Sequence, residues 1–338
     1  MDILVRSPNW IGDCVMSLPA LRALKDFMPA ANIFLVAKDY LKDIFKHINE
    51  IREIITIPNS REVRNLFFAS KKIREFKFDA GILLTNSFHS ALLFKMAGVK
   101  NVMGYRKDLR GLMLTRSIPY PRNDRHHIYF YLDLIEKFIH QKIEKSYSHS
   151  LVVSETEKGE VRALLREWGV DLSKQLIGIS TSAAYGSAKE WEPDSFRQLI
   201  INIKNQRPHT EILLFGSEGE RAKISKIMDP LNTRSFNLAG RLSLRQSIAA
   251  ISLCRLFVSN DSGLLHVAAA LGVSGVAIFG PTLPHKTAPI GNKIKVLYYP
   301  VECAPCKYRD CPIDHRCMTS ITVDEVHRAV TSLLADEA

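Results

Sequence analysis

An Asn-Asp-Ser-Gly turn at 260–263 is the strongest chemical signal in the sequence. It ends a β-branched run and opens an alanine-rich stretch that contains His266. The first amides of a helix have no partner within it and lie at the positive end of its dipole, so such a helix start can bind an anion. We therefore expect residues 262–264 to present backbone amides to a phosphate group. The alternative is an ordinary helix start that Asp261 or Ser262 caps.

A hydroxyl-rich turn at 180–191 is a second candidate for phosphate binding. Thr181 and Ser182 directly follow an apolar run, and Lys189 stands near the end of the turn. Hydroxyl groups and free amides suit phosphate oxygens, and a lysine adds a positive charge. The alternative is a polar loop with a solvated lysine.

Acidic side chains in two further turns offer different chemistry. Asp13 lies in the glycine-poor turn 6–14, which lacks the three glycines of a dinucleotide fingerprint. A carboxylate there can act as a general base, or it can simply cap a helix. Glu218 and Glu220 follow a later strand, where acids can bind ribose hydroxyls or favour a helix N-terminus.

The segment 303–317 concentrates thiols, with the spacing C-x2-C-x4-C-x3-H-x-C. Four cysteines, or three cysteines and one histidine, are a possible zinc site. The second cysteine pair lacks the usual two-residue gap, so a thiol-rich loop held by prolines is the alternative. The candidate ligands are Cys303, Cys306, Cys311 and Cys317, with His315 between the last two.

Short apolar strands alternate with amphipathic helices along the whole chain, a pattern typical of βαβ units and parallel sheets. Strands are expected at 3–5, 33–37, 54–57, 80–84, 102–105, 176–180, 211–216, 236–239, 256–259, 275–279 and 295–298. Helices are expected at 18–27, 41–48, 62–75, 90–97, 155–168, 194–206, 218–228, 244–253, 263–271 and 322–334. In the last helix, Thr322 and Glu325 have the spacing of a capping box.

The alternation restarts after a polar run near 143–151, which predicts two doubly wound α/β domains. We expect domains at 1–150 and 151–320, followed by a C-terminal helix at 321–338. Parallel sheets bind ligands at the carboxyl ends of their strands. The candidate turns all lie at such ends.

The charge of the chain is uneven. The 338 residues have a net charge of +11, and residues 1–150 contain 24 basic and 15 acidic side chains. The segment 52–125, with 15 basic and 6 acidic residues, accounts for this whole excess. An acidic partner is therefore expected: a nucleic acid, an anionic membrane or a phosphorylated substrate. The composition excludes a disordered or collagen-like chain.

No apolar run approaches the length of a membrane-spanning helix, and the first residues do not have the pattern of a signal peptide. We therefore expect a cytoplasmic protein whose six cysteines are reduced or bound to a metal.

Taken together, four motifs make the sequence similar to a known family. They are Pro-Asn-Trp-Ile-Gly-Asp at 8–13, Ala-Ala-Tyr-Gly-x-Ala-Lys-x-Trp at 183–191, the run 260–272 and the cysteine-rich tail 303–318. In this order they resemble the bacterial lipopolysaccharide heptosyltransferases of glycosyltransferase family 9. The resemblance spans nearly the whole chain, and the combination is specific although each motif alone is weak.

The resemblance implies a GT-B fold: two Rossmann-like domains that face each other across a ligand cleft. The donor nucleotide sugar is expected on the C-terminal domain and the acceptor on the N-terminal domain. The implied reaction transfers L-glycero-D-manno-heptose from ADP-heptose to the first heptose of the lipopolysaccharide inner core, with inversion. It requires no cofactor. The implied partners are these two substrates and the anionic inner-membrane surface, where the protein would be peripheral; nucleic acid is not expected.

The resemblance also implies roles for individual residues. Asp13 matches the general base and Lys189 the lysine at the pyrophosphate. The other expected donor contacts are Thr181, Ser182, Glu220, Asp261, Ser262, Gly263, Leu264 and His266. Position alone suggests the basic residues for the acceptor: Arg61, Arg64, Arg106, Lys107 and Arg110.

Other functions remain to be weighed against this one. The same fold can belong to the enzyme that adds the first heptose, to another sugar transferase of the family or to a nucleotide-sugar epimerase. A zinc-dependent nucleic-acid-binding protein would also explain the charge and the cysteines. However, the basic residues lie at 52–125 and the cysteines at 303–317, and no basic-aromatic stacking motif appears.

Overall fold

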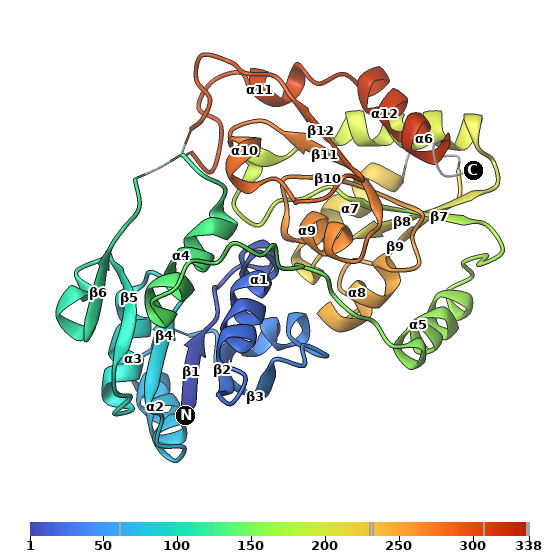
Figure 1. The fold of residues 1–338 in the computed structure, drawn as a ribbon. Helices are drawn as coiled ribbons and strands as arrows, with labels where there is room; N and C mark the ends of the chain where they lie inside the picture. Colours follow the sequence, from blue (N-terminus) through green and yellow to red (C-terminus); the bar gives the residue numbers. More distant parts are fainter. Residues whose placement is uncertain (61, 123, 230, 232, 307, 336–338) are drawn as a thin grey trace. The chain divides into compact units, whose positions relative to one another are not determined.

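The computed structural model describes residues 1–60, 62–122, 124–229, 231, 233–306 and 308–335. The chain forms two compact units, Met1–Leu151 and Val152–Ala338. Figure 1 shows the first unit in blue to green and the second in green-yellow to red. Each unit is a parallel sheet covered by helices, the α/β architecture expected from the alternating pattern.

The first unit has a six-stranded sheet in the order β3-β2-β1-β4-β5-β6, and every neighbouring pair is parallel. The first strand therefore lies at the centre, and the chain reverses its direction of winding there, as in a Rossmann-like sheet. The strands are β1 (Asp2–Arg6), β2 (Asn32–Lys38), β3 (Ile51–Ile57), β4 (Ala80–Leu83), β5 (Val102–Arg106) and β6 (Arg116–Pro119).

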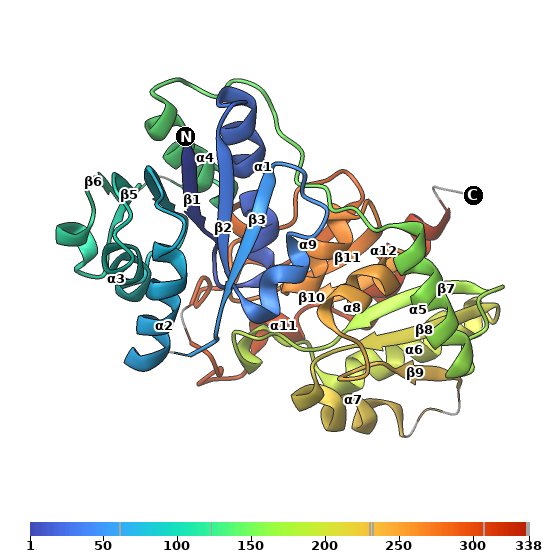
Figure 2. The same cartoon turned by 90° about the horizontal axis from the view of Figure 1, so that it is seen from below.

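Helices cover both faces of this sheet, as the two views show (Figures 1 and 2). Helices α1 and α4 pack together, and α2 packs with α3. The second pair shares a core with Leu4, Phe34 and Leu83 of the sheet. The helices are α1 (Ile11–Phe27), α2 (Val63–Arg74), α3 (Phe88–Met96) and α4 (His127–Ile139), with 3-10 turns η1 (Asp39–Ile44) and η2 (Arg110–Met113).

The second unit repeats the topology with the order β12-β11-β10-β7-β8-β9, again all parallel. Its strands β8, β10 and β11 are buried throughout, and β7 is buried after its first residue, which explains their continuous apolar runs. The strands are β7 (Gln175–Ser180), β8 (Thr210–Phe215), β9 (Ser235–Asn237), β10 (Leu256–Asn260), β11 (Ser274–Phe279) and β12 (Ile294–Tyr298).

Helices α6, α7 and α12 share one core with this second sheet. The remaining long helices of this unit also pack together: α5 contacts α8, and α8 contacts α9. The helices are α5 (Glu155–Glu167), α6 (Pro193–Gln206), α7 (Arg221–Met228), α8 (Leu244–Ile251), α9 (Gly263–Ala270), α10 (Pro284–Thr287), α11 (Arg316–Thr319) and α12 (Val323–Ala335), with 3-10 turns η3 (Ser187–Lys189) and η4 (Glu218–Glu220).

All eleven expected strands are present within a few residues of their expected ends. Several helical elements and one strand differ from expectation. The strand β6, the helices α4, α10 and α11 and the 3-10 turn η2 are additional, and α1 begins at Ile11 and not at residue 18. The helix expected at 41–48 is the 3-10 turn η1, and the one expected at 218–228 begins as the 3-10 turn η4. The capping box at the start of α12 is confirmed, since the Thr322 amide donates to the Glu325 carboxylate at 2.9 Å and the Glu325 amide donates to the Thr322 hydroxyl at 3.3 Å. Helix α12 packs on α6 and on β11, so it is part of the second unit's core.

None of the helices in the described ranges is both long enough and apolar enough to cross a membrane.

Candidate functional site

Lys189, Asp261 and Thr282 form a polar cluster in the second unit. The Lys189 ammonium donates to Asp261 Oδ2 at 2.5 Å, and the Thr282 hydroxyl donates to the same oxygen at 2.7 Å. The three residues come from the segments that follow β7, β10 and β11, at the carboxyl ends of the strands. The Lys189 side chain is 15% exposed and that of Asp261 7% exposed, so the ion pair is largely protected from water. An ammonium has three N–H donors, so Lys189 can bind a further anion without leaving Asp261.

Asn260 holds the two phosphate-binding candidates together. Its side chain is fully buried; Nδ2 donates to the Thr181 carbonyl at 2.8 Å, and Oδ1 accepts from the Trp191 amide at 3.0 Å. The turn 180–191 is thereby tied to the end of β10. Asn260 is not among the site residues expected from the sequence. Its position between a buried strand and the Asp-Ser-Gly turn was the available signal.

The start of α9 and two buried hydroxyls meet the requirements of an anion site. Ser262, the residue before the helix, makes no side-chain hydrogen bond to the amides of the first turn. Its hydroxyl instead lies 2.7 Å from that of Ser259. The hydroxyls of Thr181 and Ser182 are buried and have no partner among the described residues. Because buried polar atoms are normally paired, these two oxygens are candidates for binding a polar ligand. Gly263 and Leu264 open the helix, and His266 is buried in it.

Glu220 has a local structural role. Its carboxylate accepts from the Ser217 amide at 2.6 Å and from the Ser217 hydroxyl at 2.8 Å, which forms a capping box at η4. One carboxylate oxygen of Glu220 therefore caps the start of η4, which is the alternative to ribose binding. Glu218 pairs with Arg221 at 3.5 Å.

The cysteine-rich segment supports the turn that carries Lys189. The Ala188 amide donates to the Arg309 carbonyl at 2.8 Å, and the Ser187 hydroxyl donates to Asp310 at 2.6 Å. His315 Nε2 lies 2.9 Å from the Ala188 carbonyl. Three contacts to adjacent residues fix the backbone immediately before Lys189.

The cysteines themselves line a cavity of about 240 Å³ together with His315. Among the residues that the structure describes, no three His, Cys, Asp or Glu side chains are grouped so that they could hold a metal ion. Burial, reinforced by the neighbouring thiols, raises the pKa of Cys317 to about 11, so its thiol is protonated at neutral pH. The other members are Cys303, Cys306 and Cys311.

In the first unit, Asp13 lies in the first turn of α1 and pairs with a tyrosine that the sequence analysis missed. The Tyr131 hydroxyl, on α4, donates to Asp13 Oδ1 at 3.2 Å. Burial and the charge of Asp13 raise the pKa of Tyr131 well above its usual value, so the phenol stays a donor. The helix begins at Ile11 after Trp10, so Asp13 is not the capping residue.

Arg6 fixes the loop that leads to Asp13. Its buried guanidinium donates to the Ser7 carbonyl at 2.8 Å, the Val36 carbonyl at 3.1 Å and Asn9 Oδ1 at 2.8 Å. Burial lowers the pKa of Arg6 to about 10, which leaves it charged at neutral pH. The Tyr40 hydroxyl donates to the Asn9 carbonyl from the other side of the loop.

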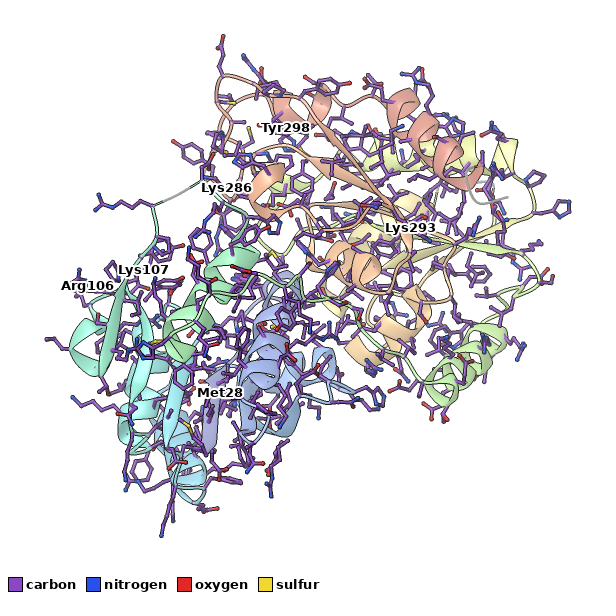
Figure 3. All side chains as sticks on the ribbon, in the orientation of Figure 1. Met28, Arg106, Lys107, Lys286, Lys293 and Tyr298 are labelled. Carbon is purple, nitrogen blue, oxygen red and sulfur yellow. The ribbon has the colours of Figure 1, made fainter. Side chains whose placement is uncertain are left out.

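The basic residues expected at the acceptor divide into two groups. Arg64, Arg106 and Lys107 are exposed, and Figure 3 labels Arg106 and Lys107 at the end of β5. Arg110 is fully buried, which corrects its expected surface role. Arg61 lies outside the described residues.

The Arg110 guanidinium is engaged by the protein itself. It donates to the Tyr105 carbonyl at 2.8 Å, the Thr85 carbonyl at 2.5 Å and Asn86 Oδ1 at 3.1 Å. Burial lowers its pKa to about 10. Arg110 thus joins the ends of β4 and β5 rather than offering a charge to a ligand.

A cavity of about 390 Å³ in the first unit contains none of the expected site residues. It is lined by Met1, Met28, Ala80 and Asn101 among others, at the amino ends of β1 and β4; Figure 3 labels Met28. Ligands of parallel sheets bind at the opposite edge, which is where the expected site residue Asp13 lies.

The family model for glycosyltransferase family 9 (heptosyltransferase) matches residues 67–316. The chain belongs to this family. It is therefore a glycosyltransferase, and its two Rossmann-like units are those of the GT-B fold.

Several family 9 proteins are similar over their full length. The lipopolysaccharide heptosyltransferase 2 of Salmonella typhimurium is 28% identical over 357 residues, covering 100% of this chain and 99% of that protein. The structure of Escherichia coli ADP-heptose lipopolysaccharide heptosyltransferase II is 28% identical with a TM-score of 0.87, covering 100% of this chain and 99% of the other. The lipopolysaccharide heptosyltransferase 1 of Pseudomonas aeruginosa is 23% identical, covering 92% of this chain and 87% of that protein.

Proposed function

We propose that this family 9 enzyme transfers L-glycero-D-manno-heptose from ADP-heptose to the first heptose of the lipopolysaccharide inner core, with inversion at the anomeric carbon. The full-length similarity to heptosyltransferases 2 supports this choice over the enzyme that adds the first heptose. The observation that carries the donor assignment is the Lys189–Asp261–Thr282 cluster beside two unpartnered buried hydroxyls and the uncapped start of α9.

In this proposal the second unit binds the donor. The Thr181 and Ser182 hydroxyls and the first amides of α9 donate to the diphosphate, and Lys189 offsets the charge that grows on ADP as it leaves. A preorganised donor is most effective where charge develops in the transition state. Asp261 orients the lysine, while Thr282 satisfies the same carboxylate oxygen. Glu220 would bind the ribose with the carboxylate oxygen that the capping box leaves available.

The first unit would bind the acceptor, and Asp13 would act as the general base. Inversion requires that the acceptor oxygen attacks the anomeric carbon while the bond to ADP breaks, and Asp13 takes the proton of that hydroxyl. Tyr131 orients the carboxylate by donating a hydrogen bond to Oδ1. Arg6 and Tyr40 hold the loop around Asn9 by hydrogen bonds, and this loop keeps the start of α1 in place.

The proposal also includes independence from divalent cations. In many sugar transferases a metal neutralises the diphosphate through an Asp-x-Asp motif, which this sequence lacks. Lys189 and the α9 amides would supply the positive charge at the diphosphate in place of such a metal. Turnover should therefore persist in excess EDTA. Loss of turnover that magnesium restores would contradict this part of the proposal.

The exposed cations of the first unit would bind the charged acceptor. They would also bind the cytoplasmic face of the inner membrane, where the protein would be peripheral. Inner cores contain carboxylates and phosphates, and anionic lipids attract basic surfaces. Arg106 and Lys107 are the described candidates for the acceptor because they are exposed beyond the carboxyl end of β5.

The decisive experiment is a transfer assay with ADP-heptose and two acceptors, one with and one without the first heptose. Mass spectrometry should show heptose addition only to the monoheptosylated acceptor. Addition to the acceptor without heptose would identify the enzyme of the preceding step. Conversion of the nucleotide sugar without transfer would identify an epimerase. A lack of ADP binding in calorimetry would refute the proposed donor site.

A further inference from the structure

We propose that the solvent-facing side of α2 is a membrane-docking surface for anionic phospholipid. This surface, here called the α2 face, consists of Arg64, Phe67, Phe68, Lys71 and Lys72. The inference deepens the membrane part of the proposed function, because it names the surface and the lipid chemistry that the surface recognises.

The α2 face is a continuous stripe on one helix. Its residues follow the spacing i, i+3, i+4, i+7 and i+8, which places them side by side along the helix. The opposite side of α2 packs into the core of the first unit through Ala69 and Ile73. The helix therefore needs no membrane to be stable, and its outer face is free to serve another purpose.

Two large aromatic side chains lie in the middle of this face. Phe67 is 57% exposed and Phe68 55% exposed, and their ring centroids are 6.1 Å apart in an edge-to-face arrangement. The Arg64 guanidinium lies 5.7 Å from the centroid of the Phe68 ring. Single exposed apolar residues are ordinary, whereas an adjacent aromatic pair within a charged rim is typical of an interaction surface.

The charges around the pair are of one sign. Helix α2 contains no acidic residue, and Lys71 and Lys72 follow the aromatic pair by one turn. The nearest acids in the sequence, Glu62 and Glu75, lie just outside the helix ends. An interfacial helix combines these features: aromatic rings enter the headgroup region, and lysine and arginine bind anionic headgroups.

The same charges argue against a second copy of the chain as the occupant. A two-fold symmetric contact would place the α2 face against itself and bring the cations of both copies together. An anionic bilayer offers the opposite charge and an apolar layer beneath it. It is also the surface on which the lipid-anchored acceptor of the proposed reaction is presented.

Co-sedimentation of the full-length protein with vesicles tests the inference. Vesicles of phosphatidylethanolamine with phosphatidylglycerol should bind the protein, and vesicles of phosphatidylcholine alone should bind it at least tenfold more weakly. Phe67→Ser/Phe68→Ser and Lys71→Glu/Lys72→Glu should each weaken binding to the anionic vesicles about tenfold or more. Circular dichroism should show that both variants remain folded, since all four side chains are exposed.

Two matched controls come from the second unit. Tyr308→Ser/Ile313→Ser removes apolar side chains of similar exposure, 60% and 59%. Arg162→Glu/Arg166→Glu makes the same change in net charge on α5. Both controls should bind the vesicles within about twofold of the unchanged protein. Equal losses in the controls and in the α2 variants would overturn the inference, as would wild-type binding that does not depend on anionic lipid.

A deacylated, water-soluble acceptor separates this inference from the proposed function. The aromatic α2 variant should keep its kcat and KM with that acceptor and lose activity only with acceptor embedded in vesicles. A raised KM for the soluble acceptor would mean that the α2 face binds the sugar, which overturns lipid docking. A protein that binds anionic vesicles but transfers no heptose would leave the docking surface intact and refute the proposed reaction.

Discussion

Tyr131 helps to orient Asp13 through a hydrogen bond from helix α4. Because its pKa is raised well above the usual value, the phenol does not compete with the carboxylate as a base. A donor of this kind holds the carboxylate where the proposed reaction needs a base.

Replacement of Asp13 by Asn removes the base and keeps the shape of the side chain. We expect kcat to fall by about 10²–10⁴, the usual contribution of a positioned base. ADP affinity, measured by calorimetry, should not change, because the proposed donor contacts lie in the second unit. Tyr131→Phe is the graded control and should lower kcat by about tenfold or less. Normal turnover of the Asn variant would refute the assignment of the base.

Lys189→Met tests the proposed charge at the diphosphate. Loss of a hydrogen bond to a charged group costs about 1.5–3 kcal/mol, which corresponds to roughly a 10- to 150-fold weaker binding of ADP. Asp261→Asn keeps the lysine and removes its orienting charge, so it should have a smaller effect. Unchanged ADP affinity and unchanged kcat in the Lys189 variant would exclude the residue from the donor site.

Arg110 and Lys107 are close in sequence and should behave in opposite ways. Arg110→Ala leaves two backbone carbonyls and the Asn86 side chain without their donor, so it should cost about 3 kcal/mol or more of stability. Lys107→Ala removes an exposed side chain and should stay within about 0.5 kcal/mol. Denaturant unfolding measures both. Equal stability of the two variants would contradict the structural role of Arg110.

At the scale of elements, the cysteine-rich segment acts on the donor site through the backbone. It makes hydrogen bonds with Ser187 and Ala188, and the residue before them is a glycine for a steric reason. Gly186 has φ +152, and a Cβ there would lie 2.4 Å from the Arg309 carbonyl oxygen. Any side chain at this position must push the two segments apart and shift Lys189 with them.

Gly186→Ala should therefore weaken ADP binding about tenfold and lower the melting temperature, since backbone strain of this kind costs roughly 1–3 kcal/mol. The matched control is Gly159→Ala in α5, where a Cβ would meet no atom within 4 Å. This control should keep ADP affinity and raise stability by about 0.5–1 kcal/mol, because alanine is the better helix former. An unaffected Gly186 variant would show that the segment does not position Lys189.

The elements follow from the sequence where their own residues determine them. Periodicity predicts the buried strands, and the Thr322–Glu325 spacing predicts the start of α12. The short strand β6 has no strong apolar pattern, since only Ile118 of Arg116–Pro119 is a large apolar residue. The run 41–48 has helical spacing, but the chain there forms the 3-10 turn η1, which ends at Ile44.

The candidate site could be predicted only in part, because some of its contacts join residues that are distant in the sequence. Turns after strands identify Asp13, Lys189 and Asp261, because a parallel sheet gathers such turns at one edge. The partner of Asp13 comes from a helix 118 residues away, and no local pattern predicts that pairing. Burial of Arg110 depends likewise on the packing of η2 against α3, so its position in a basic segment was misleading.

At the scale of the whole molecule, the charge excess belongs to one unit, and within it most described cations of the acceptor set are exposed. Arg106→Gln/Lys107→Gln should raise the KM for a deacylated acceptor severalfold and leave ADP affinity unchanged. Arg162→Gln/Arg166→Gln in the second unit is the charge-matched control and should change neither quantity. Steady-state kinetics and calorimetry measure the two. Equal effects on acceptor and ADP would indicate a general electrostatic effect and not an acceptor site.

The exclusively parallel sheets also determine how the chain must fold. Within the described residues neither sheet contains a hairpin, so each strand pair joins residues that are far apart in sequence, as in the pairing of Ile3 with Ala80. Closing such long loops before any strand contact forms makes folding slow. All six strands of the first unit end by Pro119, and α4 ends at Ile139. The ribosome therefore completes every element of one unit before it begins the other, which lets each sheet assemble without competing strands from its near-twin.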